Sequence, residues 1–288
     1  MATVPERCAA AGDSNVFICD FSPPRGGDPA LLQDARELNA DFISVAYNPG
    51  RSVRVNSVLT AHWIKANIGR DTLFTVATRD MNKVATQSLL LGAALLGLQN
   101  AVVVKGDAFT EKDLERVRAV DDFTPTELIA SITAMNQGVD FRGVKLRSPT
   151  NFAVGATIDL NRDMEREVVL AHRKAKAGAS FFLLQAVFEP STVKAFWECY
   201  QEAHGQALRQ PLFCGVQVMA PESITFGNVP RWVIKGMASG RAGSDIAVEL
   251  VRRFADQGLS YIYLVPPILK GGVRDYDAAR RVLTAFGR

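Results

Sequence analysis

Three apolar segments of this chain contain or lead into polar side chains that could do chemistry. Asp20 lies within VFICDF, and Gln185 lies within FFLLQAVF. AVVV leads directly into Lys105 and, two residues later, Asp107. A carboxyl group can transfer a proton, a buried amide needs hydrogen-bonding partners, and a desolvated lysine can act as an amine nucleophile. These residue types indicate acid–base or Schiff-base chemistry on a small ligand with a hydrogen-bonding edge.

Structural explanations stay open for the same residues. Asp20 could cap the turn at FSPP, and Gly106 followed by Asp107 is a common turn pair. An unpaired carboxylate within an apolar run is costly, so Asp20 needs either a partner or a functional role.

Eight apolar runs rich in β-branched and aromatic residues predict the strands that must position these side chains. They span residues 16–21, 42–47, 72–77, 101–104, 152–156, 181–187, 212–218 and 261–265. Amphipathic stretches of helical period, such as PALLQDARELNA and SDIAVELVRRFADQG, separate most of them. Near-continuous apolar strands that alternate with helices indicate parallel pairing, so the sequence predicts an α/β fold, a (β/α)8 TIM barrel. An open doubly wound sheet is the alternative, and the lack of G-x-G-x-x-G after the first strand counts against it.

The carboxyl ends of the strands in such a barrel meet at one mouth, where we expect the site. The polar residues at these ends are Asp20, Tyr47, Asn48, Thr75, Thr78, Arg79, Asp80, Lys105, Asp107, Thr157, Asp159, Gln185 and Gln217. The longest connection, 107–124, is charged and predicts a flap over one end. No linker divides the chain, so we expect one domain over residues 1–288, with 1–15 as a flexible or peripheral segment.

Composition excludes several classes of function. Lys and Arg total 33 against 30 acidic residues, and these charges are spread along the chain, which gives no case for nucleic acid. The four cysteines lack ligand spacing, so neither zinc nor disulfides are expected. The three histidines, His62, His172 and His204, fall in helical segments, which does not support a Ser/His/Asp hydrolase. No apolar stretch of 18 residues and no leader is apparent, so we expect a cytoplasmic protein without membrane contact.

Seven motifs resemble methylenetetrahydrofolate reductases in their order and spacing. They are CDFSPPRGGDP, FISVAYNPGR, ATRDMN, VVVKGD, SPTNFAVGATID, KAGASFFLLQAVFEP and YLVPP, and the resemblance covers residues 16 to about 283. It is closest to the branch also found fused to homocysteine methyltransferases. The resemblance implies a (β/α)8 barrel that reduces 5,10-methylenetetrahydrofolate to 5-methyltetrahydrofolate, in one-carbon metabolism and methionine biosynthesis. The hydride would come from NAD(P)H, usually through bound FAD.

The resemblance also implies roles for individual residues. Asp20, three residues before Pro23, takes the place of the family's catalytic glutamate and would protonate the folate. Asp107, Gln185 and Tyr47 would bind the folate. The cofactor would be held by Thr75, Lys105, Asp107, Thr157 and Lys174, with Lys174 at its phosphates.

Three positions depart from the family pattern. Thr75 stands in place of a histidine, Ala46 in place of a threonine, and Thr157 in place of a tyrosine. All three usually touch FAD, so direct hydride transfer from NAD(P)H to folate is an alternative to the flavin route.

Two other functions stay open. A Schiff-base lyase would use Lys105, although Asp107 nearby favours a charged lysine. A catalytically degenerate barrel would bind folate and act with a partner methyltransferase. A homo-oligomer is also open, and the choice between NADH and NADPH is not readable from the sequence.

Overall fold

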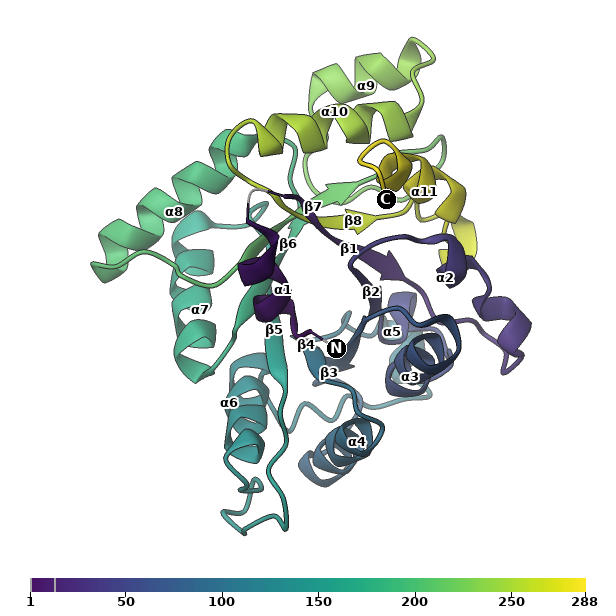
Figure 1. Cartoon of the computed structure of the whole chain (residues 1–288). Coiled ribbons are helices and arrows are strands. Elements are labelled where there is room, and N and C mark those ends of the chain that lie inside the picture. The colour runs from purple at the N-terminus through teal and green to yellow at the C-terminus, as the bar shows by residue number, and fades with distance from the viewer. Residues whose placement is uncertain (1, 13) are drawn as a thin grey trace.

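Eight parallel strands close into a barrel in chain order, with helices around it (Figure 1). The computed structural model describes residues 2–12 and 14–288. The strands are β1 (Val16–Phe21), β2 (Phe42–Val45), β3 (Thr72–Ala77), β4 (Asn100–Val104), β5 (Ala153–Ile158), β6 (Phe181–Ala186), β7 (Leu212–Gln217) and β8 (Tyr261–Val265). Pairing of β1 with β8 closes the ring. The predicted single-domain TIM barrel is confirmed.

Helices connect the strands and cover the outside of the barrel (Figure 1). The α-helices are α1 (Val4–Ala11), α2 (Asp34–Glu37), α3 (Ser57–Ile68), α4 (Lys83–Leu95), α5 (Glu111–Leu114), α6 (Pro125–Asn136), α7 (Met164–Ala177), α8 (Pro190–His204), α9 (Arg231–Ala238), α10 (Gly243–Ala255) and α11 (Tyr276–Thr284). Three 3-10 turns, η1 (Pro29–Leu32), η2 (Pro49–Arg51) and η3 (Lys270–Gly272), lie in the connections. In the part of the chain that the structure describes, no helix combines the length and apolar character needed to cross a bilayer.

Local sequence explains where the helices begin. Thr124 caps α6 by accepting from the backbone N–H of Glu127, whose side chain accepts in return from Thr124. Pro125 occupies the first turn, where its missing N–H costs nothing. Such caps satisfy the free N–H groups of the first helical turn. The helices pack against the sheet through apolar side chains, such as Phe74 and Phe182 of the strands.

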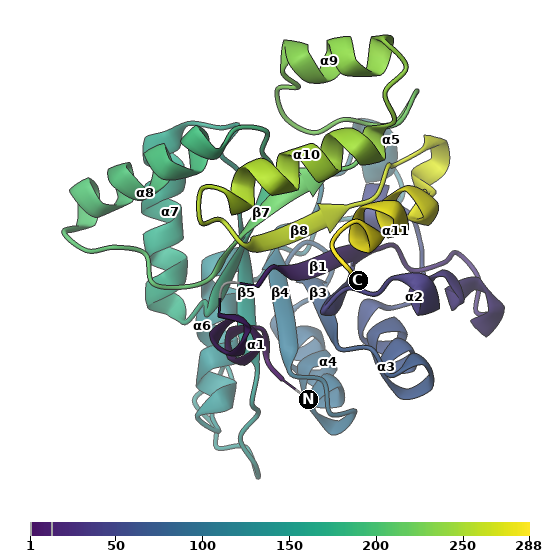
Figure 2. The same cartoon turned by 45° about the horizontal axis from the view of Figure 1, so that its top comes forward.

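Helix α1 lies against the amino-terminal ends of the strands (Figure 2). The backbone N–H of Val4 donates to Oδ1 of Asn100 at the start of β4, over 2.9 Å. Val4 and Cys8 are buried among the apolar side chains inside the barrel. The segment 1–15, expected to be flexible or peripheral, is therefore largely helical and contributes to the core; its residues 1 and 13 lie outside the described residues. The helix covers the amino end, so the barrel is open at its carboxyl end.

Candidate functional site

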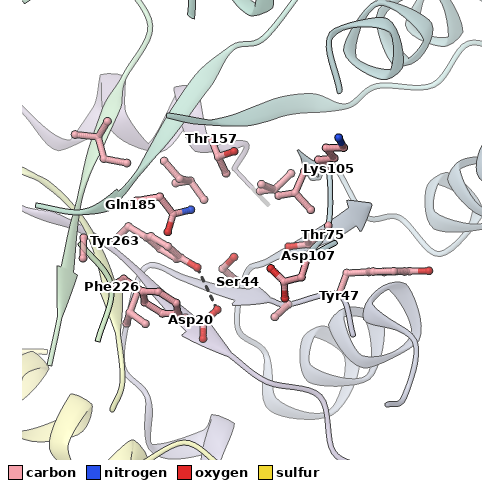
Figure 3. A pocket seen from close by; sticks show the side chains of 18 of the residues that line it. Asp20, Ser44, Tyr47, Thr75, Lys105, Asp107, Thr157, Gln185, Phe226 and Tyr263 are labelled. Atoms are coloured by element: carbon pink, nitrogen blue, oxygen red, sulfur yellow. Dashed lines mark hydrogen bonds between the residues drawn. The ribbon is translucent and has the colours of Figure 1, made fainter. Parts of the chain in front are cut away.

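A cavity of about 350 Å³ opens at the carboxyl ends of the strands. Seven of the eight residues predicted for the site line it, namely Asp20, Tyr47, Thr75, Lys105, Asp107, Thr157 and Gln185. Figure 3 shows Asp20 and Gln185 on one side and Asp107 on the other. The eighth, Lys174, is not among the lining residues. The barrel thus brings together side chains that are up to 165 positions apart in the chain, from Asp20 to Gln185.

The Asp20 carboxylate is held by two donors in the cavity wall. The Tyr263 hydroxyl donates to Oδ1 over 3.1 Å, as drawn in Figure 3, and Arg274 Nε donates to Oδ2 over 3.0 Å. The side chains of Arg274 and Asp20 are only 6% and 7% exposed, so solvent screens their attraction weakly. Burial alone would lower the pKa of Arg274, but the charge and hydrogen bond of Asp20 raise it above its ordinary value. Asp20 therefore has the partner that its burial requires, while it still faces the cavity.

Tyr263 is a donor that keeps its proton. Burial, and then the neighbouring Asp20 charge, raise the pKa of Tyr263 well above its ordinary value. Neither Tyr263 nor Arg274 was predicted from the sequence. The alternation of tyrosine with aliphatic residues at the start of YIYLV could have indicated that Tyr263 lies on a different face of β8 from Ile262 and Leu264. No local signal marks Arg274, which lies 254 positions from Asp20.

Gln185 reaches the cavity from an irregular part of β6. Leu183 pairs with Phe213 and Ala186 pairs with Gly215, so three steps along β6 match two along β7. Strand β6 therefore contains one extra residue between these two pairs, which makes a β-bulge. Bulges redirect side chains next to functional sites. Gln185 is exposed to the cavity although the other residues of β6 are buried.

The bulge depends on the glycine opposite it. A Cβ at Gly215 would lie 2.4 Å from the carbonyl oxygen of Leu184 and 2.5 Å from that of Gln185. Both are backbone atoms, so they can move only if the strand moves. Gly215 therefore permits the close approach of β6 and β7 that places Gln185.

We expect Gly215→Ala to destabilise the protein by about 1–3 kcal/mol, because the new methyl group overlaps the bulge. We also expect it to weaken the binding of any ligand that Gln185 contacts. Chemical denaturation and ligand titration measure the two effects. Gly92→Ala in α4 is the control, since a Cβ there meets nothing within 4 Å. A Gly215→Ala variant as stable as the wild type would show that the bulge does not need Gly215.

The end of β4 presents Lys105 and Asp107 to the cavity rim. Both residues are exposed, and Figure 3 shows the Lys105 amine pointing away from the other side chains. A Schiff-base lysine is expected to be desolvated, so the exposure of Lys105 removes the basis of that alternative. The Asp107 backbone carbonyl accepts a hydrogen bond of 2.7 Å from Arg79 Nη1.

Tyr47 follows β2 and lies on the same side of the cavity as Asp107 (Figure 3). Burial and the nearby Asp80 carboxylate raise its pKa to about 12, so it stays a neutral phenol. Its hydroxyl points away from the centre of the cavity in Figure 3. Tyr47 thus offers the cavity its ring and backbone rather than its hydroxyl.

Lys174 supports the cavity wall from behind. Its Nζ donates to the carbonyl oxygen of Thr157 over 2.6 Å, and burial lowers its pKa. The expected contact with cofactor phosphates would require this amine to leave the Thr157 carbonyl. Thr75, which lies in β3, is also buried, with 8% of its surface exposed.

Other reactive side chains lie away from this cavity. His172 and His204 stack at 3.8 Å between α7 and α8, and the cysteines at 8, 19, 199 and 214 are free. Within residues 2–12 and 14–288, no group of three or more His, Cys, Asp or Glu side chains could hold a metal ion.

The fold and cavity define a TIM-barrel protein with its site at the carboxyl mouth. The model of the methylenetetrahydrofolate reductase family matches residues 6–232, and the chain belongs to this family. The match is to the family as a whole, so the branch fused to homocysteine methyltransferases stays a prediction. Tyr263 and Arg274 lie beyond the matched residues.

Among solved structures, the chain is similar to an uncharacterized protein from Clostridium thermocellum that binds two copies of 5-methyl-5,6,7,8-tetrahydrofolic acid. The TM-score is 0.63 at 12% identity, over 98% of this chain and 99% of that one. At this identity the likeness shows the fold alone. No match was found among curated proteins.

Proposed function

We propose that this protein reduces 5,10-methylenetetrahydrofolate to 5-methyltetrahydrofolate with a hydride from NAD(P)H. The observation that carries the proposal is the convergence of Asp20, Asp107 and Gln185 on one cavity of a chain in this family. The solved structure that binds 5-methyltetrahydrofolate supports the same ligand class through its shared fold.

The reaction needs a proton and a hydride at neighbouring atoms. As a folate nitrogen takes the proton, its bond to the methylene carbon breaks, and the other nitrogen forms an iminium with that carbon. The hydride then adds to the iminium carbon and gives the methyl group. Asp20 takes a proton from solvent at the open cavity and passes it to the first of these nitrogens, and Tyr263 and Arg274 hold its carboxylate in place.

The remaining polar groups orient the folate. Gln185 carries both a donor and an acceptor, which suits the polar edge of a pterin ring. Asp107 lies across the cavity from Gln185 (Figure 3). In this arrangement its carboxylate accepts from the N–H groups of the pterin ring. Holding the ring from two sides fixes the acceptor carbon against the hydride donor.

The flavin implied by the family resemblance fits these residues poorly. Lys174, expected at the FAD phosphates, donates instead to the Thr157 carbonyl. Thr75 and Thr157 supply short hydroxyls where the resemblance implies aromatic rings. We therefore assign no step to FAD and propose direct transfer from the reduced nicotinamide to the folate.

Purified protein mixed with methylenetetrahydrofolate and either NADH or NADPH tests this function. Without added FAD, we expect loss of nicotinamide absorbance matched one to one by 5-methyltetrahydrofolate. Activity only after FAD is added would overturn direct transfer and keep the reductase. No activity under either condition, with 5-methyltetrahydrofolate binding in calorimetry, would favour a folate-binding barrel that acts with a partner methyltransferase.

A further inference from the structure

Arg79 is a buried cation that the reaction above does not use. It follows β3, lines the cavity and is 5% exposed. Its Nε and Nη2 bind both carboxylate oxygens of Asp80, the latter over 2.7 Å. This hydrogen bonding raises the pKa of Arg79, so the guanidinium remains charged. The bidentate pair fixes the plane of the guanidinium and leaves Nη1 as the group that points elsewhere.

That group reaches the connection after β4. Nη1 donates to the Asp107 carbonyl over 2.7 Å, and the guanidinium carbon lies 4.2 Å from the centre of the Phe109 ring. One side chain thus holds two alternate residues of the same loop, by a hydrogen bond and by a cation–π contact.

The Arg79 backbone holds the two ends of the same segment. Its N–H donates to the Lys105 carbonyl over 3.2 Å, and its carbonyl accepts from the N–H of Val120 over 2.8 Å. Gly106 makes the tight turn between, with a φ of +89°, and a Cβ there would lie 3.3 Å from the Cβ of Arg79. Arg79 therefore contacts the connection from 105 to 120 at Lys105, at Asp107 and Phe109, and at Val120.

We propose that Arg79 is a positioning residue that sets where the Asp107 carboxylate stands in the cavity; this rests on the proposed folate reduction. The Asp107 side chain is exposed, so its place follows from its backbone, and Arg79 binds that backbone. The planar guanidinium of Arg79 has several N–H donors in a fixed arrangement, so one side chain can bind Asp80 and Asp107 together. The single ammonium of lysine does not reproduce this geometry.

A second arginine holds the same connection from outside. Arg51 pairs with Asp113 over 3.0 Å, and its Nη1 donates to the Ala108 carbonyl over 3.5 Å. It does not line the cavity, and both side chains of the pair are about a third exposed, at 32% and 35%. Arg51 is therefore a matched control: it is the same residue type and binds the same connection, but its bonds go to Ala108 and Asp113.

Steady-state kinetics of Arg79→Met, Arg79→Lys and Arg51→Met test the inference. We expect Arg79→Met to raise the KM for methylenetetrahydrofolate about tenfold with a smaller change in kcat, because a misplaced binding group costs affinity first. Arg79→Lys should recover part of this loss, and Arg51→Met should stay within about twofold of wild type.

A double-mutant cycle separates positioning from general structural support. In an Asp107→Ala background, Arg79→Met should raise the KM little further, since the group it places is gone. The same rise in both backgrounds, or a rise equal to that of Arg51→Met, would overturn the proposal. If the wild-type protein neither turns over nor binds folate, the proposed function fails. Amide hydrogen exchange of residues 105–120 in Arg79→Met then still tests whether Arg79 orders this connection. Unchanged exchange in these residues would overturn the positioning role of Arg79.

Discussion

Asp20→Asn lowers kcat for folate reduction by about 10²–10⁴-fold, the usual contribution of a general acid–base group. Asparagine has nearly the shape of aspartate but carries no proton that it can transfer. Because Gln185 and Asp107 still orient the ring, the KM for folate changes much less than kcat. Single-turnover measurements with saturating reduced nicotinamide isolate this step from product release.

Two further variants make this expectation decisive. Asp20→Glu keeps a carboxyl on the same wall, and we expect it to retain far more activity than Asp20→Asn. Asp28→Asn serves as the control, since Asp28 caps η1 outside the cavity by accepting from Ala30. If Asp20→Asn turned over like wild type, Asp20 would have no part in the chemistry.

The barrel, and the meeting of Asp20, Asp107 and Gln185 at its carboxyl end, could be predicted from the sequence. Parallel strands covered on both faces must be apolar along their length, so VFICDF and FFLLQAVF stand out, and so do the polar residues within them. Closure then forces the strand ends together. Asp20 and Gln185 meet at one cavity because of that topology, and not because of any local motif.

The contacts that tune these residues were not readable. Arg274 comes from a loop beyond β8, and the register shift that exposes Gln185 depends on Gly215 in another strand. Arg79 and Asp80 were expected at the carboxyl end of the third strand, but no local signal shows that Arg79 also binds the Asp107 backbone. Lys174 was expected at a phosphate, but the length of its side chain lets it reach the Thr157 carbonyl instead. Which hydrogen-bond partner a side chain such as Lys174 or Arg274 takes depends on the three-dimensional packing around it.

Arg274→Met destabilises the protein by about 3–5 kcal/mol, because it leaves the buried Asp20 carboxylate without a countercharge. Both side chains of the pair are more than nine-tenths buried, so solvent does not replace the lost partner. Tyr263 still donates to Oδ1, but a neutral hydroxyl offsets only part of the charge. Chemical denaturation of the wild type and the variant at the same pH measures the loss.

The double variant Asp20→Asn with Arg274→Met shows whether the loss comes from the charge or from packing. Removing both charges should restore most of the stability, since no buried charge is then left without a countercharge and Tyr263 can still donate to the asparagine oxygen. The surface pair Arg253 and Glu249 provides the comparison: its side chains are 43% and 33% exposed, so Arg253→Met should cost at most about 1 kcal/mol. If the double variant were as unstable as Arg274→Met alone, the arginine would stabilise the barrel mouth by its packing. The hydrogen bond from Tyr263 would then be the contact that positions Asp20.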